Sequence, residues 1–308
     1  MNWRVRMDTK LFDDWNVQLA KTYKPGMIKD GEWFSISQKI NGTRATYFAG
    51  HLISRTGHEF LGLDHIIEEL CDINKYMGEA YAFDGELRLK TTGNISDNAA
   101  FRIGNGIVTS QNDFSQKQKI GFIIFDMIPA KWWANDSCDT KYKERLKRMH
   151  SIPWSKYKYV EEIPVFYAGY SINQIEICSD FAYENQMEGI MINRDSMYQF
   201  KRTSELLKYK KFNTIDLEVI GFQEGTGKYE GVLGALVCKM GSNTVYVGSG
   251  FTDEQRYEIW EMQEAFLHKL VEVKYKDITN NKETGLASLQ FPVFVRFRDT
   301  IDKDISDA

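Results

Sequence analysis

Short hydrophobic stretches, most of them alternating with polar residues, recur through the first two thirds of the chain and predict β-strands. Four stretches are expected as strands: residues 34–38, 45–49, 82–89 and 121–126. In the third, the period of two puts Asp84, Glu86 and Arg88 on one face, where polar side chains can do chemistry. The fourth is almost wholly apolar and ends at Asp126, which is typical of a buried strand.

A helical pattern is expected to begin at Ser171, with Ile172, Ile175 and Phe181 on the inner side of the helix. Beyond residue 211 the pattern indicates five further strands, at residues 217–222, 233–239, 244–247, 270–275 and 291–297. One helix interrupts them, and the capping-box sequence Thr-Asp-Glu-Gln at residues 252–255 marks its start. Five strands and one helix in a segment of this size are typical of an OB-fold β-barrel.

These elements predict an α+β protein of two domains. Residues 1–211 are expected to form the first domain, with antiparallel sheets and helices, and residues 212–308 the second, the OB-fold barrel. A length of 308 residues suits one large or two ordinary domains.

Composition narrows the class of protein without selecting a function. No apolar run approaches the roughly 18 residues of a membrane span, so no membrane partner is expected. The first eight residues carry charges where a signal peptide needs apolar side chains, so export is not expected. The four cysteines are widely spaced and form no CxxC pair, which argues against a disulfide framework or a structural zinc site and favours the cytoplasm.

Cations cluster locally although the net charge is −4. Five of them lie close together in sequence: Lys201, Arg202, Lys208, Lys210 and Lys211. Lys208 and Lys210 flank Tyr209, so on a strand they share one face, which could line a phosphate site. A solvated surface is the alternative interpretation of such a run of charges.

Three short motifs carry the candidate chemistry. They are Lys-Ile-Asn-Gly-Thr-Arg at residues 39–44, Phe-Asp-Gly-Glu at residues 83–86 and Glu-Gly-Ile-Met at residues 188–191. A desolvated lysine near other cations can lose its proton and become a nucleophile. Glutamates supply the oxygen ligands that Mg²⁺ prefers. A lysine beside a glycine turn, with two separate carboxylates, therefore indicates metal-assisted nucleotidyl transfer.

Each element also has an ordinary explanation when taken alone. A lysine before a glycine turn is usually a surface hairpin, and Phe-Asp-Gly-Glu is usually a turn. Phe125 on an apolar strand is more often a core residue, Arg55 near Gly57 a solvated turn residue, and Glu188 the end of a helix. The joint occurrence of the motifs, in this order, favours the functional interpretation.

In this order, together with the strand ending at Asp126, the Lys-Tyr-Lys box and the terminal segment 291–299, the motifs resemble those of ATP-dependent DNA ligases, particularly the small viral and bacterial kind. These belong to the lysine-adenylating nucleotidyltransferases, which also include RNA ligases and mRNA-capping guanylyltransferases. The resemblance extends from about residue 23 to residue 299. It implies an ATP-grasp-like adenylation domain followed by the OB-fold domain.

The resemblance implies roles for the nucleotide-binding residues. Lys39 would attack the α-phosphate of ATP and hold AMP as a phosphoramidate, and Arg44 would contact the sugar and later the DNA phosphate. Glu86 would contact the ribose or the metal, and Glu188 would help to place Mg²⁺, for which Mn²⁺ is a possible substitute. Phe125 would stack on adenine.

The same resemblance implies roles for the remaining cations. Lys208 and Lys210 would neutralise the α-phosphate, and Arg298 with Asp299 would orient the pyrophosphate leaving group. The implied partner is nicked duplex DNA, bound by a monomer through Arg44 and three further residues: Arg55, Lys201 and Arg202. Arg55 would grip the 5′-phosphate at the nick.

Two positions depart from the family pattern. Asn41 stands where the family usually has aspartate, which puts the role of position 41 in doubt. Asp299 is not followed directly by lysine, so Lys303 would complete the terminal box only if the turn after Asp299 brings it back. The polar segment 91–119 is expected to be a long loop from which Arg102, Lys117 and Lys119 reach the DNA backbone, with an inert surface insertion as the equal alternative.

Three rival functions stay open. An RNA ligase would share the first-domain chemistry, and a capping enzyme would form a guanylate on Lys39. A noncatalytic OB-type nucleic-acid-binding protein would need only the C-terminal segment, and it leaves Lys39, Glu86 and Glu188 unexplained.

Overall fold

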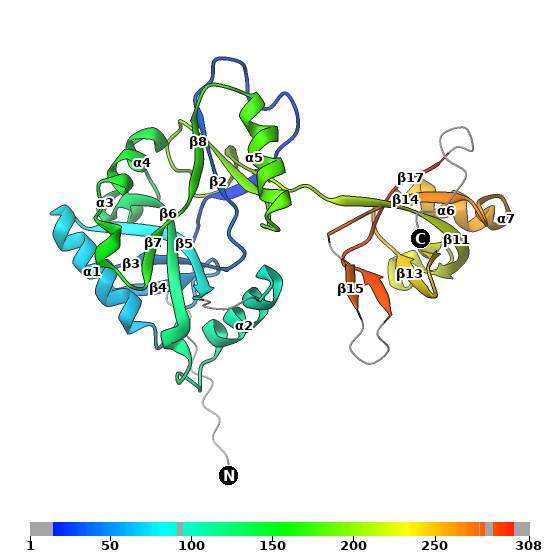
Figure 1. The fold of residues 1–308 in the computed structure, drawn as a ribbon, viewed down its shortest axis with the longest axis horizontal. Helices are drawn as coiled ribbons and strands as arrows, with labels where there is room; N and C mark the ends of the chain where they lie inside the picture. The colour runs from blue at the N-terminus through cyan, green and yellow to red at the C-terminus, as the bar shows by residue number, and fades with distance from the viewer. Residues whose placement is uncertain (1–14, 91–94, 277, 281–285, 299–308) are drawn as a thin grey trace, which may run out of the picture. The chain divides into compact units, whose positions relative to one another are not determined.

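The computed structural model describes residues 15–90, 95–276, 278–280 and 286–298. The chain divides into two compact units, Met1–Lys211 and Phe212–Ala308 (Figure 1). Each unit has hydrophobic core clusters of its own. Within the described ranges, no helix is long and apolar enough to cross a membrane.

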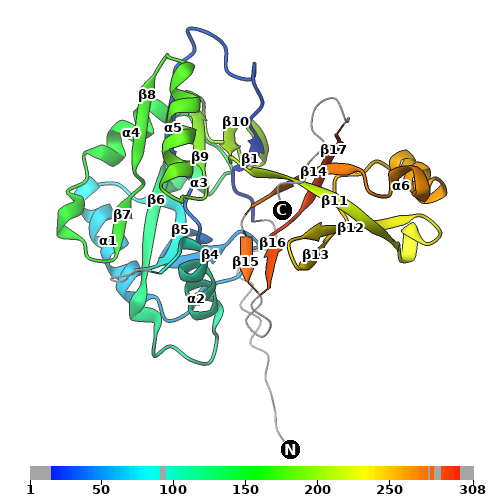
Figure 2. The same ribbon diagram turned by 45° about the vertical axis from the view of Figure 1, so that its right-hand side comes forward.

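The first unit contains two five-stranded sheets. One has the order β1 (Leu19–Thr22), β10 (Arg202–Tyr209), β9 (Ile190–Arg194), β2 (Phe34–Gln38) and β8 (Val165–Gly169). All its pairings are antiparallel except β1–β10. Helix α5 (Asn173–Glu184) lies alongside this sheet in both views (Figures 1 and 2). Its buried residues Ile175, Cys178 and Ala182 share one core cluster with residues of β2 and β9.

The other sheet has the order β4 (His51–Ser54), β3 (Thr43–Phe48), β5 (Tyr81–Leu89), β6 (Ile120–Pro129) and β7 (Val160–Glu162), with only β6–β7 parallel. Its helices are α1 (Asp64–Met77), α2 (Asp97–Thr109), α3 (Ala130–Trp133) and α4 (Tyr142–His150). The apolar face of α1 buries Ile66, Leu70 and Ile73 in the same cluster as Phe83 and Phe122. The turn between β2 and β3 joins the two sheets, so residues 39–42 lie where the sheets meet.

The second unit is built on a sheet of order β13 (Asn243–Val247), β12 (Leu233–Met240), β11 (Asn213–Glu224), β14 (Leu270–Tyr275) and β17 (Val293–Phe297). Helices α6 (Asp253–Glu261) and α7 (Gln263–Phe266) lie between β13 and β14 in sequence, and β15 (Ile278–Asn280) pairs with β16 (Ala287–Leu289). A parallel bridge between Ser249 and Val293 brings the two edges of the sheet together. In the described part of this unit no strand ladder closes the barrel, so the expected OB-fold appears in its partly open form.

Most of the expected elements are confirmed. The stretch expected at residues 34–38 is β2 itself, and the other core stretches fall on β3, β5 and β6. The capping box is also confirmed, because Thr252 and Gln255 each bind the other's backbone N–H through their side chains. One placement is wrong: Phe181 is 47% exposed, since the apolar side of α5 passes through Ile175 and Ala182 instead.

The expectation of a polar loop over residues 91–119 is wrong. Residues 97–109 form α2, whose start is capped by the Ser96 side chain, which accepts a hydrogen bond from the backbone N–H of Ala99. Lys117 is fully buried, and its Nζ donates to the carbonyl of Val108 at 2.8 Å, so it does not extend toward solvent or DNA. The first four residues of the segment, 91–94, lie outside the described residues.

Candidate active site

The register of the first sheet brings the lysine motif and the Glu-Gly-Ile-Met motif together. Gln38 at the end of β2 pairs with Ile190, and the N–H of Lys39 donates to the carbonyl of Gly189 at 2.8 Å. On the other side of β9, Ile190 pairs with Tyr209 of β10. Residues 39, 188 and 210 therefore meet at one end of the sheet, although they are far apart in sequence.

Glu188 binds both lysines. Its Oε2 accepts from Nζ of Lys39 at 2.6 Å, and its Oε1 forms an ion pair with Nζ of Lys210. Burial would raise the pKa of Glu188, but the two lysines outweigh this effect and hold its pKa below the ordinary value. The expectation that Lys39 lies beside cations is therefore incomplete, because its direct partner is a carboxylate.

Glu86 is the second carboxylate of the site. It lies on β5 directly opposite Arg44 of β3. Its Oε2 is buried and has no hydrogen-bond partner among the described residues. Burial raises the pKa of Glu86 to about 7, although Arg44 and Lys39 act in the opposite direction. An unpartnered carboxylate oxygen of this kind is a suitable ligand for a cation.

The carboxylates fit a magnesium ion that takes most of its ligands from elsewhere. Among the described residues there is no group of three or more histidine, cysteine, aspartate or glutamate side chains that could hold a metal alone. Mg²⁺ is commonly bound by one or two carboxylates plus substrate phosphates and water. Glu86, with its unpartnered oxygen, and the neighbouring Glu188 match that pattern.

Arg44 is fixed by three contacts. Its Nε and Nη2 donate to the two carboxylate oxygens of Asp84 at 2.6 and 2.5 Å, and Nη2 also donates to the carbonyl of Gln18 at 3.2 Å. The guanidinium lies over the ring of Phe125, 4.5 Å from its centroid. Phe125 therefore lies beside Arg44, and its expected contact with adenine stays a prediction.

Two motif glycines are required by close packing. A Cβ at Gly42 would lie 2.7 Å from the carbonyl oxygen of Leu87 and 3.3 Å from Oε2 of Glu86. A Cβ at Gly189 would lie 2.4 Å from the carbonyl oxygen of Tyr209, and its φ of +137° also favours glycine. The glycines thus let the motif backbones approach the neighbouring strands.

Three cations expected to bind DNA gather around one cavity. Arg55, Lys201 and Arg202 line a cavity of about 450 Å³, together with the aromatic residues Trp15 and Phe200. All three cationic residues are exposed. The structure therefore brings Arg55 of the β4 turn next to the start of β10.

The other residues expected to bind the nucleotide do not gather in one place. Lys208 lies on β10, whereas Lys210 follows the end of that strand. Arg298 belongs to the second unit, where its Nε donates to Asp216 at 3.0 Å and its Nη2 lies 3.4 Å from Glu272. Asp299 and Lys303 lie outside the described residues.

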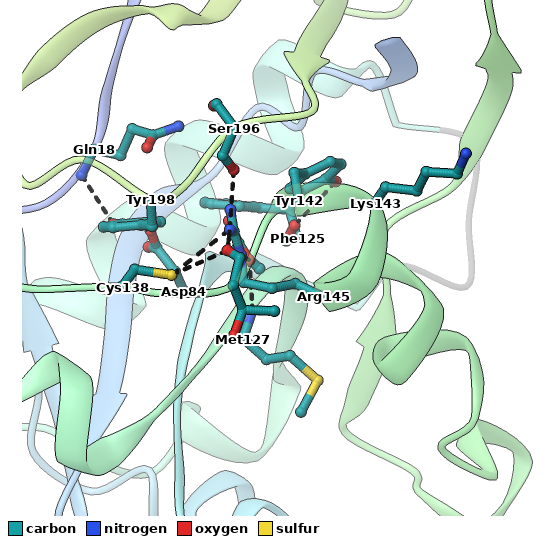
Figure 3. Close-up of polar contacts among 12 residues, drawn as sticks. Gln18, Asp84, Phe125, Met127, Cys138, Tyr142, Lys143, Arg145, Ser196 and Tyr198 are labelled. Atoms are coloured by element: carbon teal, nitrogen blue, oxygen red, sulfur yellow. Dashed lines mark hydrogen bonds and ion pairs between the residues drawn. The ribbon is translucent and has the colours of Figure 1, made fainter. Parts of the chain in front are cut away.

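Sequence reasoning missed the polar groups behind Arg44. Figure 3 shows Tyr198 directed at Asp84, with Gln18 beside it. The figure also shows Arg145. This buried residue binds both carboxylate oxygens of Asp126, at 2.7 and 2.8 Å. The period-two alternation placed Asp84 on the functional face, but no local pattern indicates Tyr198 or Gln18 as its neighbours.

Comparison with known proteins gives a consistent match. Residues 224–298 match the family described as "DNA ligase OB-like domain". A DNA ligase from Haemophilus influenzae is 26% identical over 286 residues, which cover 90% of this chain and 92% of that protein.

Solved structures extend the similarity to the fold. The structure named "Pmar-Lig_PreS3" is 26% identical, with a TM-score of 0.72, covering 92% of this chain and 67% of that one. The ATP-dependent DNA ligase of bacteriophage T7, solved in complex with ATP, shares the fold at 15% identity, with a TM-score of 0.56, covering 93% of this chain and 99% of that one. The expected combination of an adenylation unit and an OB-like unit is therefore confirmed at the level of the fold.

Proposed function

We propose, since this chain belongs to the ATP-dependent DNA ligase family, that it joins the 5′-phosphate and 3′-hydroxyl ends of a nick in duplex DNA. The observation that carries this proposal is the convergence of Lys39, Glu188 and Lys210 at one sheet end, beside the unpartnered carboxylate of Glu86. Such a group of side chains is suited to forming and breaking a lysine–phosphorus bond.

Three in-line displacements make up the reaction. Nζ of Lys39 forms a bond to the α-phosphorus of ATP, and pyrophosphate leaves with the electrons of the broken P–O bond. The 5′-phosphate of the nick then takes the AMP from Lys39, and finally the 3′-hydroxyl attacks the activated phosphate and expels AMP. Lysine attacks only as the free amine, so the ion pair with Glu188 must rearrange when the nucleotide binds.

The neighbouring side chains supply charge and position. Lys210 and Lys208 are the cations that would face the phosphate, Arg44 would hold the sugar, and Phe125 would contact the base. Glu86 and Glu188 would hold Mg²⁺, which neutralises phosphate charge when bound. Mn²⁺ offers similar oxygen-ligand chemistry and is the expected substitute.

DNA would bind to the exposed cations. The cavity lined by Arg55, Lys201 and Arg202 presents three positive charges beside two aromatic rings, which suits a phosphate of the nicked strand. Arg298 would orient pyrophosphate from the second unit. We also propose that the protein is a monomer and that it acts in the cytoplasm. Size-exclusion chromatography with and without nicked DNA tests whether it is a monomer.

A sealing assay tests this function. Purified protein with Mg²⁺ and ATP is expected to convert a labelled nicked duplex into the joined strand, with a steep loss of DNA binding as salt rises. The same assay with GTP, and with a nicked RNA duplex, separates the rival functions. Labelling of the protein by GTP alone would indicate a capping enzyme, and sealing of the RNA duplex alone would indicate an RNA ligase.

A further inference from the structure

A closed ring of hydrogen bonds lies behind Arg44. The hydroxyl of Tyr198 donates to Oδ2 of Asp84 at 2.5 Å, and it accepts from the backbone N–H of Gln18 at 2.9 Å. Arg44 completes the ring, because it donates to Asp84 and to the carbonyl of Gln18. The ring joins residues from four separate parts of the chain, of which Figure 3 shows Gln18, Asp84 and Tyr198.

We propose that Tyr198 is a positioning residue for Arg44, an inference that rests on the proposed function. Asp84 is completely buried, so only the groups that bind its carboxylate fix how that carboxylate is turned. Arg44 binds both oxygens of Asp84 as a planar fork, and its own orientation therefore follows that of the carboxylate. Two neutral hydroxyls also bind this carboxylate: Thr46 donates to Oδ1 at 3.5 Å, and Tyr198 donates to Oδ2 at 2.5 Å. Tyr198 is the closer of the two and therefore sets this orientation.

The positioning matters because Arg44 has one nitrogen left for a ligand. Nε and Nη2 are used within the protein, whereas no hydrogen bond of Nη1 is seen in the described part of the chain. A turn of Asp84 would move Nη1 relative to the bound nucleotide. Burial raises the pKa of Tyr198 far above its ordinary value, so its hydroxyl remains a donor at every working pH.

Tyr198 also belongs to the segment that contains Lys201 and Arg202, two of the cationic residues expected to bind DNA. The N–H of Gln199 donates to Oε1 of Gln18 at 2.6 Å, and Phe200, Lys201 and Arg202 follow directly and line the cationic cavity. The same short segment thus contacts Arg44 through Asp84 and is expected to contact DNA. The structural alternative is that Tyr198 serves only as a core ring, since it packs on Trp133 and Phe200.

Tyr198→Phe separates the two roles, because it keeps the ring and removes only the hydroxyl. Loss of a buried hydrogen bond to a charged group is expected to lower the maximal rate of Lys39 adenylation roughly tenfold, with the KM for ATP changing less than about threefold. Tyr47→Phe is the matched control. Tyr47 is an equally buried tyrosine of β3 whose hydroxyl contacts Cys71, and its variant is expected to keep the wild-type rate.

A double-mutant cycle with Arg44→Lys tests whether Tyr198 acts through Arg44. Lysine cannot form the two-pronged contact with Asp84. In the Arg44→Lys variant, Tyr198→Phe is therefore expected to lower the adenylation rate little further. If Tyr198→Phe lowers the rate by the same factor with Arg44 and with lysine, or leaves it unchanged with Arg44, the inference is overturned. Absence of adenylation and sealing by the wild-type protein would instead overturn the proposed function.

Discussion

Glu86 shows how one side chain can carry a functional signal that its motif alone does not. Its Oε2 is buried without a hydrogen-bond partner among the described residues, the backbone of Gly42 packs closely beside it, and burial raises the pKa of Glu86 to about 7. A carboxylate in this state is stabilised by a cation. The adjacent Glu188 already has two lysines as partners, so the two glutamates are not equivalent.

The raised pKa of Glu86 predicts a pH-dependent requirement for magnesium. A proton and Mg²⁺ compete for the same carboxylate, so the Mg²⁺ concentration that half-saturates adenylation should rise roughly tenfold per pH unit below the pKa of about 7, and level off above it. Titrating Mg²⁺ at a series of pH values measures this. Glu86→Gln should bind Mg²⁺ weakly at every pH, and a half-saturating concentration that does not change with pH in the wild type would contradict the assignment.

The raised pKa of Glu86 also makes the stability of the metal-free protein depend on pH. The pKa of Glu86 is raised in the folded state from 4.5 to about 7, so protonated Glu86 is favoured by folding. Its contribution to stability is fully present below pH 4.5 and is lost as the pH rises through about 7. Added Mg²⁺ should therefore stabilise the protein more at high pH than at low pH.

At the scale of elements, the sequence predicted best the buried strands of the first unit, which their apolar residues mark. Strands β2, β5 and β6 follow their expected stretches, and the capping box at Thr252 marks α6 correctly. Helix α2 was missed because its glycines and asparagines are poor helix formers, while burial of Ala100 and Val108 holds it in place.

Residues of the candidate site could be predicted from the sequence only where they belong to a short motif. Lys39 and Glu188 were named from their motifs, although the contact between them depends on the register of β2 and β9. Tyr198 and Gln18 were not predicted, because they are brought together by pairing between segments 180 residues apart, which leaves no local pattern. Of the terminal box, Arg298 lies in the described part of the second unit and binds Asp216, whereas Asp299 lies outside the described residues.

Helix α2 offers a matched pair of glycines for a stability prediction. Gly106 is exposed and nothing lies within 4 Å of an added Cβ, so Gly106→Ala should raise the free energy of unfolding by about 0.5–1 kcal/mol. At Gly104 the added Cβ would lie 3.1 Å from the backbone nitrogen of Leu89, so Gly104→Ala should bring no such gain. Urea unfolding followed by tryptophan fluorescence compares the two, and an equal gain for both would show that α2 does not pack as described.

At the scale of the whole molecule, the second unit has its own core and carries Arg298, which we assign to the pyrophosphate leaving group. The side chain of Arg298 is 19% exposed and binds Asp216 and Glu272 within that unit. The assignment therefore requires the C-terminal unit to close over the nucleotide for the first step and to move away when DNA binds, as gating elements commonly do.

Arg298→Ala distinguishes a catalytic role from a local structural one. We expect adenylation by ATP to slow by roughly 10²-fold and sealing of a nick that already carries AMP to change little, because the second reaction has no pyrophosphate to orient. Single-turnover rates of the two steps measure this, with thermal unfolding as the control for loss of the Asp216 contact. Equal slowing of both steps would show that Arg298 serves stability or DNA binding.

The most direct test of the account is the covalent intermediate on Lys39. Protein incubated with ATP and Mg²⁺ should gain the mass of one AMP, and peptide mapping under neutral conditions should place it on Lys39. Lys39→Ala should gain no AMP, yet it should still seal a nick whose 5′-phosphate already carries AMP. AMP on another residue, or full labelling of Lys39→Ala, would contradict the central claim.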